Sequence, residues 1–173
     1  MKPINIVLTL VIIILAYLIF RGINEPIKFN KEKKHRYSFV IQRLKDIRTA
    51  EIAYKSVNGS YTGSFDSLMH FVNRGQFTLI KQIGNADDST AVLIRDTITV
   101  NVRDSIFPQG YHVDSLPFVP FGEGAKFKLE AGEIEKGKVI VKVFQAEDTA
   151  PFDPQEVLRV GSMTEPSTSG NWE

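Results

Sequence analysis

The stretch INIVLTLVIIILAYLIF, which runs from Ile4 to Phe20, is a continuous apolar run that no charged residue interrupts. Asn5 and Thr9 are its only clearly polar residues. At about 1.5 Å per residue, a helix of this length lies at the short end of what crosses about 30 Å of hydrocarbon. The stretch therefore predicts a single-pass transmembrane anchor over residues 1–22. Its membrane-facing side chains would be Ile4, Val7, Leu8, Leu10, Ile13, Leu15, Leu18 and Phe20.

Two other interpretations of this stretch stay open. A cleaved secretory signal also begins with a basic residue and an apolar run, but it ends in small residues of the A-x-A type. The sequence LIFRGINEP, residues 18–26, contains no such site. A buried core helix is the third interpretation, although so uniform an apolar surface is unusual in a small domain. We favour the uncleaved anchor.

The composition limits the size and the partners of the rest of the chain. With 173 residues, the chain can form one ordinary domain besides the anchor. Its 21 basic and 20 acidic residues give no broad positive field, so we expect no nucleic-acid partner. The sequence contains no cysteine, which excludes disulfide bonds, cysteine-based zinc sites and thiol nucleophiles.

Beyond the anchor, GINEP at residues 22–26 predicts a hinge over residues 23–28, since glycine and a residue before proline both disfavour a helix. A long amphipathic helix should follow, with Asn30 as its N-cap and Asn58-Gly59 as its end. Its apolar stripe consists of Tyr37, Val40, Ile41, Leu44, Ile47, Ala50, Tyr54 and Val57. The charged residues expected largely on its other faces are Lys45, Asp46, Arg48, Glu51 and Lys55.

A short second helix and several strands complete the predicted elements. Ser64 would cap this helix and Gly75 would end it. Its buried face would contain Phe65, Leu68, Phe71 and Val72. The strand patterns are Phe77–Ile83, Ala91–Ile94 and Thr97–Val102, and a hairpin of Lys126–Glu130 and Lys138–Gln145 around the polar loop AGEIEKG.

Two further segments differ from these elements in composition. Prolines and aromatic residues fill residues 103–124, so we expect an ordered, packed loop there. The polar residues 162–173 predict a flexible tail. Together the elements predict an α+β fold, in which the long helix packs on a small antiparallel sheet within a head domain over residues 29–161.

The sequence offers no arrangement of residues typical of catalysis or metal binding. Its histidines, His35, His70 and His112, fall on separate predicted elements and lack metal-ligand spacing. Asp87-Asp88 could contact a cation but fits a solvated turn better. We therefore expect no catalytic residue, no metal, no cofactor and no small-molecule substrate. The basic run at residues 31–36 would either begin a solvated helix or contact anionic lipid.

The segment AEIAYKSVNGSYTGSFDSLMHFV, residues 50–72, resembles the end of the long helix in type IV pilins and type II secretion pseudopilins. Residues 1–75 share the outline of that family, with an apolar helix followed by an amphipathic one. In the family, a glycine ends the helix, a tyrosine packs back against it and a leucine seals the helix–sheet core. The matching positions here are Ala50, Ala53, Tyr54, Asn58, Gly59, Tyr61, Phe65 and Leu68.

The resemblance implies a structural protein that assembles in the cell envelope and is not an enzyme. Its partners would be the membrane and other membrane-anchored envelope proteins, in a homo- or hetero-oligomer. It would sit in the inner (cytoplasmic) membrane with the head outside the cytoplasm, whereas basic residues after the apolar run would favour a cytoplasmic head. The likeliest contact surfaces would be the loop at residues 103–122 and the polar tail.

A second hypothesis is a membrane-tethered binding module that captures a ligand or a secreted protein near the aromatic loop. Pilins usually carry a glutamate near the start of the apolar run, where this sequence has Asn5. They also carry a short basic leader that ends in glycine before this run. These differences favour the binding module over polymerisation.

Overall fold

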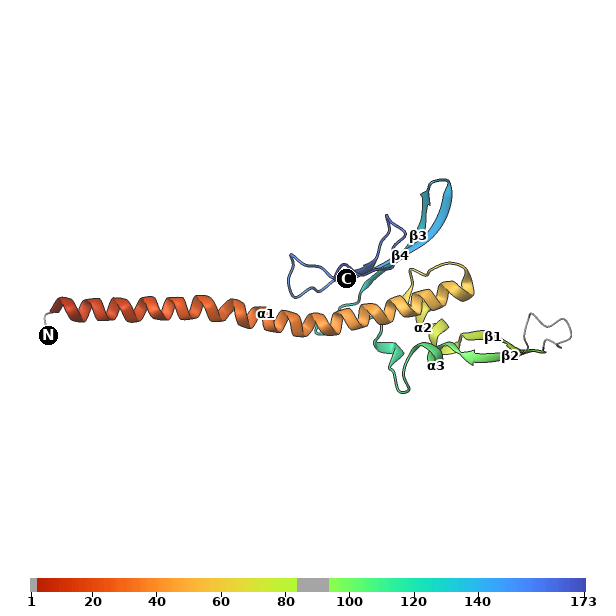
Figure 1. Cartoon of the computed structure of the whole chain (residues 1–173), viewed down its shortest axis with the longest axis horizontal. Helices are drawn as coiled ribbons and strands as arrows, with labels where there is room; N and C mark the ends of the chain where they lie inside the picture. Colours follow the sequence, from red (N-terminus) through yellow and green to blue (C-terminus); the bar gives the residue numbers. More distant parts are fainter. Residues whose placement is uncertain (1–2, 84–93) are drawn as a thin grey trace. The chain divides into compact units, whose positions relative to one another are not determined.

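A computed structural model describes residues 3–83 and 94–173. Its elements are helices and small antiparallel sheets, so the α+β class is confirmed. The chain forms two compact units, Met1–Phe39 and Val40–Glu173. Helix α1, Pro3–Asn58, begins in the first unit and ends in the second (Figure 1). Within the described residues, α1 is the one helix long and apolar enough to cross a membrane.

The predicted hinge at residues 23–28 is wrong as a break in the helix, because α1 continues through Pro26. Proline removes one backbone hydrogen bond, the one that the Gly22 carbonyl would receive, and the helix continues without it. The side-chain amide of Asn24 donates to the Phe20 carbonyl at 3.0 Å, which supports the same turn. Asn30 is consequently an interior helix residue and does not cap a new helix.

The second half of α1 supplies the core of the head. Val40, Leu44, Ile47 and Ala50 are buried, which confirms the centre of the predicted stripe. Val57 at its end is 48% exposed and does not belong to the core. The largest fully buried side chains also come from other elements and include Leu68, Leu116, Phe144 and Val160.

The predicted end of α1 and the second helix are confirmed. Gly59 has φ 75 and its N–H donates to the Lys55 carbonyl at 2.8 Å, which closes the helix. Helix α2, Phe65–Arg74, begins after Ser64, whose side chain accepts from the Ser67 N–H. Gly75 follows its last residue.

The expected single sheet is instead two separate sheets. The first is a two-stranded antiparallel hairpin of β1, Gln76–Ile83, and β2, Ile94–Asn101. Most of the predicted strand Ala91–Ile94 lies outside the described residues. A short helix, α3, Val102–Ile106, continues directly from β2 and, with the loop after it, separates the two sheets.

The second sheet has the order β3-β4-β5, with β3 at Lys128–Lys136, β4 at Val139–Glu147 and β5 at Arg159–Gly161. The predicted hairpin is confirmed, but its polar loop is wrong because AGEIEK extends β3 as a strand. The turn contains only Gly137 and Lys138, with φ 58 and 70. Two residues with positive φ match the right-handed twist of a hairpin.

The loop at residues 103–124 is ordered and packed, as predicted. It contains the short helix η1, Val113–Ser115, and buries the side chains of Phe107, Val113, Leu116 and Val119. The rings of Phe107 and Tyr111 stack with 4.1 Å between centroids. Phe118 and Phe121 remain exposed at 41% and 53%.

The predicted flexible tail is instead tied to the head. The Gly161 N–H donates to Ser169 at 3.0 Å, and the Asn171 N–H donates to the Arg159 carbonyl at 3.1 Å. Arg48 on α1 pairs with Glu173 at 2.8 Å. The polar composition was misleading because these groups are satisfied by β5 and α1 and not only by water.

Figure 1 shows how the head surrounds the second half of α1. In that view, β3 and β4 lie on one side of this segment, and α2, α3 and the β1–β2 hairpin lie on the other side. Helix α1 is therefore the central element of the head.

Replacement of Gly59 by alanine should lower the free energy of unfolding of the head by about 1–2 kcal/mol, since a β-carbon disfavours positive φ. No heavy atom lies within 4 Å of the added β-carbon, so the loss would come from the backbone alone. Urea unfolding of the full chain in detergent, followed through Trp172 fluorescence, measures it. Gly59→Asn is the control, because asparagine tolerates this conformation. Equal losses in both variants would contradict the explanation.

Candidate functional site

The predicted anchor side chains lie on the surface of α1. All eight have between 53% and 69% of their surface exposed: Ile4, Val7, Leu8, Leu10, Ile13, Leu15, Leu18 and Phe20. This exposure argues against a core helix, because a core helix buries such residues. A signal sequence near the N-terminus would meet the same criteria of length and composition.

Residues 50–72 form the junction between α1, α2 and the second sheet. Ala50 and Leu68 are fully buried. The ring of Tyr54 meets that of Phe71 edge-on at 5.1 Å, and the ring of Tyr61 lies 4.7 Å from that of Phe144 on β4. The junction therefore brings together the predicted residues Ala50, Tyr54, Gly59, Tyr61, Phe65 and Leu68, with Phe65 half-buried at the start of α2.

Tyr61 is held from two sides. Besides Phe144, it contacts Lys55, whose ammonium lies 4.5 Å from the ring centroid and 3.5 Å from the hydroxyl. A cation over a tyrosine ring is attracted by the electron-rich face. The chain that leaves α1 is thereby turned back toward both α1 and β4.

Glu51 is the residue of this junction that sequence reasoning placed wrongly. It has 0% exposure, whereas we expected it largely on a solvent-facing side of the helix. The spacing held the signal, since Glu51 lies four residues after Ile47 and three before Tyr54, both on the apolar stripe. One of its oxygens accepts from the Thr62 N–H at 3.0 Å, and the other has no hydrogen-bond partner within the described residues.

Burial raises the pKa of the Glu51 carboxyl to about 8, and the hydrogen bond from Thr62 opposes this rise. The carboxyl is thus protonated in the folded protein at neutral pH. Its role is to accept a backbone hydrogen bond from the loop between α1 and α2 and so fix that loop on the helix.

A second set of contacts ties α1 to the aromatic loop. The Tyr111 hydroxyl donates to Asp46 at 2.8 Å, and the Arg43 guanidinium donates to the Ser115 hydroxyl at 2.6 Å. Burial, together with the Asp46 carboxylate, raises the pKa of Tyr111, so this hydroxyl keeps its proton. The loop is therefore fixed to the helix by polar groups as well as by its buried rings.

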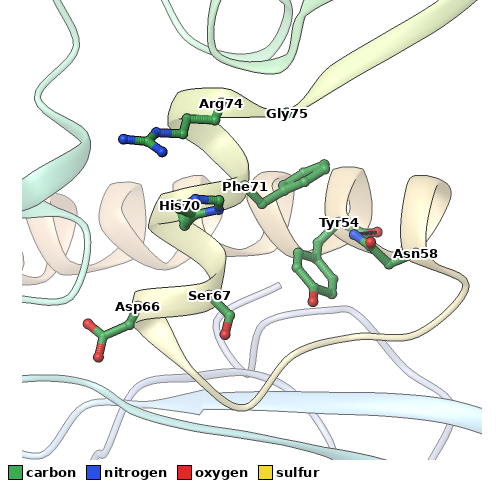
Figure 2. Close-up of a pocket in the computed structure, with 8 residues that line it drawn as sticks. All are labelled: Tyr54, Asn58, Asp66, Ser67, His70, Phe71, Arg74 and Gly75. Atoms are coloured by element: carbon green, nitrogen blue, oxygen red, sulfur yellow. Dashed lines mark hydrogen bonds between the residues drawn. The ribbon is translucent and has the colours of Figure 1, made fainter.

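An open hollow of about 510 Å³ lies where the end of α1 meets α2. Figure 2 shows its lining, in which Phe71 points toward Tyr54 while Asp66 and Arg74 point away from Tyr54 and Asn58. The charged side chains of this hollow do not converge on one point. The geometry offers a surface for contact and does not build an acid–base pair.

The three histidines remain apart in the structure. His35 lies on α1 with its ring edge-on to Phe39 at 5.2 Å, His70 lies on α2, and His112 precedes η1. Within residues 3–83 and 94–173, no three histidine or carboxylate side chains gather as metal ligands would. Asp87-Asp88 lies outside the described residues.

Glu51→Gln should remove a pH dependence of stability. The carboxyl has a usual pKa of 4.5 and a folded pKa of about 8, so its contribution is present below 4.5 and is lost as pH rises to about 8. Over this pH range, the free energy of unfolding of the wild type should fall by a few kcal/mol relative to that of Glu51→Gln. The expected scale is on the order of 1.4 kcal/mol per unit of pKa shift. Urea unfolding of the full chain between about pH 5 and about pH 9 measures this difference.

The control is Glu135→Gln, which changes an exposed glutamate of β3 and should leave the pH profile unaltered. Parallel profiles for wild type and Glu51→Gln would show that the buried carboxyl does not hold its proton.

Comparison of the chain with protein-family models, with curated proteins and with solved structures finds no match. The resemblance to pilins and pseudopilins therefore stays a prediction from the sequence. The description of the site rests on the contacts given above.

Proposed function

We propose that this chain is a membrane-anchored structural protein of the cell envelope, pilin-like or pseudopilin-like, whose function is assembly and not catalysis. The observation that carries the proposal is the nature of α1. One continuous helix exposes apolar side chains over residues 4–20 and then supplies the core of the head. The N-G-x-Y junction after this helix, with Tyr61 packed on Phe144, adds to the support.

The anchor would pack beside the anchors of neighbouring subunits, since packing and lipid release favour association of apolar helices in a bilayer. The head would offer its loop at residues 103–122 and its tail as contact surfaces. Phe118 and Phe121 are exposed on that loop, as are Val139 and Ile140 at the tip of the β3–β4 hairpin. Exposed apolar groups of this kind suit contacts with neighbouring subunits.

The pilin resemblance favours an inner-membrane location, with the N-terminus in the cytoplasm and the head outside it. The partners in this proposal are the membrane and other anchored envelope proteins.

A second candidate function is a tethered binding module with no polymerisation. Asn5 in place of a glutamate, and the hollow between α1 and α2, favour this alternative. It requires only that the head folds and that any apolar anchor holds it at the membrane.

Single cysteines at Leu10, Val11, Ile12, Ile13 and Ile14 should cross-link in membranes with helical periodicity. The chain contains no other cysteine. If anchors pack on one face, oxidation should link either Leu10, Ile13 and Ile14 or the opposite position Ile12, following about 3.6 residues per turn. Electrophoresis without reductant measures the linked fraction.

The result separates the two candidates. A periodic pattern of cross-links, between copies of this chain or to one other small envelope protein, supports assembly. Uniform weak linkage at every position would instead support the binding module. So would a head that still folds and binds its ligand when an unrelated transmembrane helix replaces residues 1–22.

A further inference from the structure

The part of α1 that follows the apolar stretch carries a cluster of lysines. Lys28, Lys31, Lys33 and Lys34 lie within two turns, and all but the half-buried Lys33 are exposed. At about 100° per residue, Lys28, Lys31 and Lys34 lie within an arc of about 120° on one side of the helix, and Lys33 lies on the other side. We call these four residues the lysine collar.

The segment between the anchor and the lysine collar has little net polarity. Arg21 and Glu25 form an ion pair at 2.7 Å, so their charges cancel. Ile23 and Ile27 are 56% and 58% exposed and continue the apolar surface. This segment therefore suits the border between hydrocarbon and headgroups.

The length of the helix places the collar at the headgroup layer. Counted from Ile4, about 20 residues cross the hydrocarbon and about four more cross the headgroup region, which brings Lys28 to its outer edge. Lys31 follows about 4.5 Å and Lys34 about 9 Å farther along the helix, distances close to or below the Debye length of about 10 Å at 0.1 M salt.

Neighbouring groups leave the collar strongly positive. Glu32 is the only acidic residue between Lys28 and Arg36. Its carboxylate pairs with Arg36 at 2.7 Å, and this hydrogen bond lowers the pKa of Glu32. The Glu32 charge is thus balanced by Arg36. The ammonium of Lys33 lies 5.4 Å from the ring centroid of Tyr37, on the side of the helix away from Lys31.

We propose that the lysine collar binds the anionic headgroups of the leaflet through which α1 leaves the membrane. This inference rests on the membrane anchor in the function proposed above and not on assembly. Lysine ammonium groups near an anionic surface attract its lipids, and the attraction falls with salt.

The full chain in nanodiscs of phosphatidylcholine and phosphatidylglycerol, at one copy per disc, tests the proposal without assembly. Electron paramagnetic resonance compares the association of spin-labelled phosphatidylglycerol with that of spin-labelled phosphatidylcholine. The anionic lipid should be enriched around the protein by more than about twofold at low salt and should lose this enrichment in high salt. Replacement of all four collar lysines by glutamine should abolish it, and replacement by arginine should preserve it.

The matched control replaces four lysines of the head, Lys126, Lys128, Lys136 and Lys138, by glutamine and should leave the enrichment unchanged. Equal association of both lipids in the wild type would overturn the proposal, as would unchanged enrichment in the collar glutamine variant. Flotation of the reconstituted chain, checked first, separates this result from failure of the anchor. A chain that does not insert would overturn both.

Discussion

The structure depends on the continuous backbone of α1, which exposes apolar side chains in its first half and supplies the core of the head in its second half. A helix satisfies its own N–H and C=O groups, so the same element can expose apolar side chains to lipid and then bury others in a domain. In its second half, contacts from several segments converge on it. Tyr54 packs edge-on against Phe71 of α2. Asp46 accepts a hydrogen bond from Tyr111 of the aromatic loop, and Arg48 forms an ion pair with Glu173 of the tail. The elements of the head are therefore held together by their contacts with α1.

Glu51 shows how the exit from this helix is organised. An apolar residue would bury more favourably there, but it would leave the Thr62 N–H without its acceptor. A protonated carboxyl supplies that acceptor without a buried charge. The second carboxyl oxygen has no hydrogen-bond partner within the described residues, which is unfavourable. The stability of the fold also falls as the carboxyl ionises. The junction thus fixes the direction of the loop at the expense of some stability.

Sequence patterns predicted the elements that depend on local spacing. The stripe through Leu44 and Ile47, the cap at Ser64 and the helix end at Gly59 follow from periodicity and capping chemistry, and all are confirmed. Patterns failed where a local preference met a wider context. The composition of AGEIEK predicts a polar loop, yet these residues pair with residues 139–144 of β4. The composition of the tail predicts flexibility, although β5 pairs with it. The charge of Glu51 predicts exposure, whereas its position beside the apolar stripe predicts burial. The structure follows the position.

The continuity of α1 through Pro26 bears on where the proposed anchor would leave the membrane. Proline deprives the Gly22 carbonyl of its usual donor, the N–H of residue 26. In the hydrocarbon, an unsatisfied carbonyl raises the free energy by several kcal/mol, whereas at the interface water or headgroups can donate a hydrogen bond to it. Counting along the helix from Ile4 places residues 22–26 at that interface, which agrees with the position that the lysine collar requires. In the proposed membrane anchor, the proline and the lysines are thus consistent with the same depth for α1.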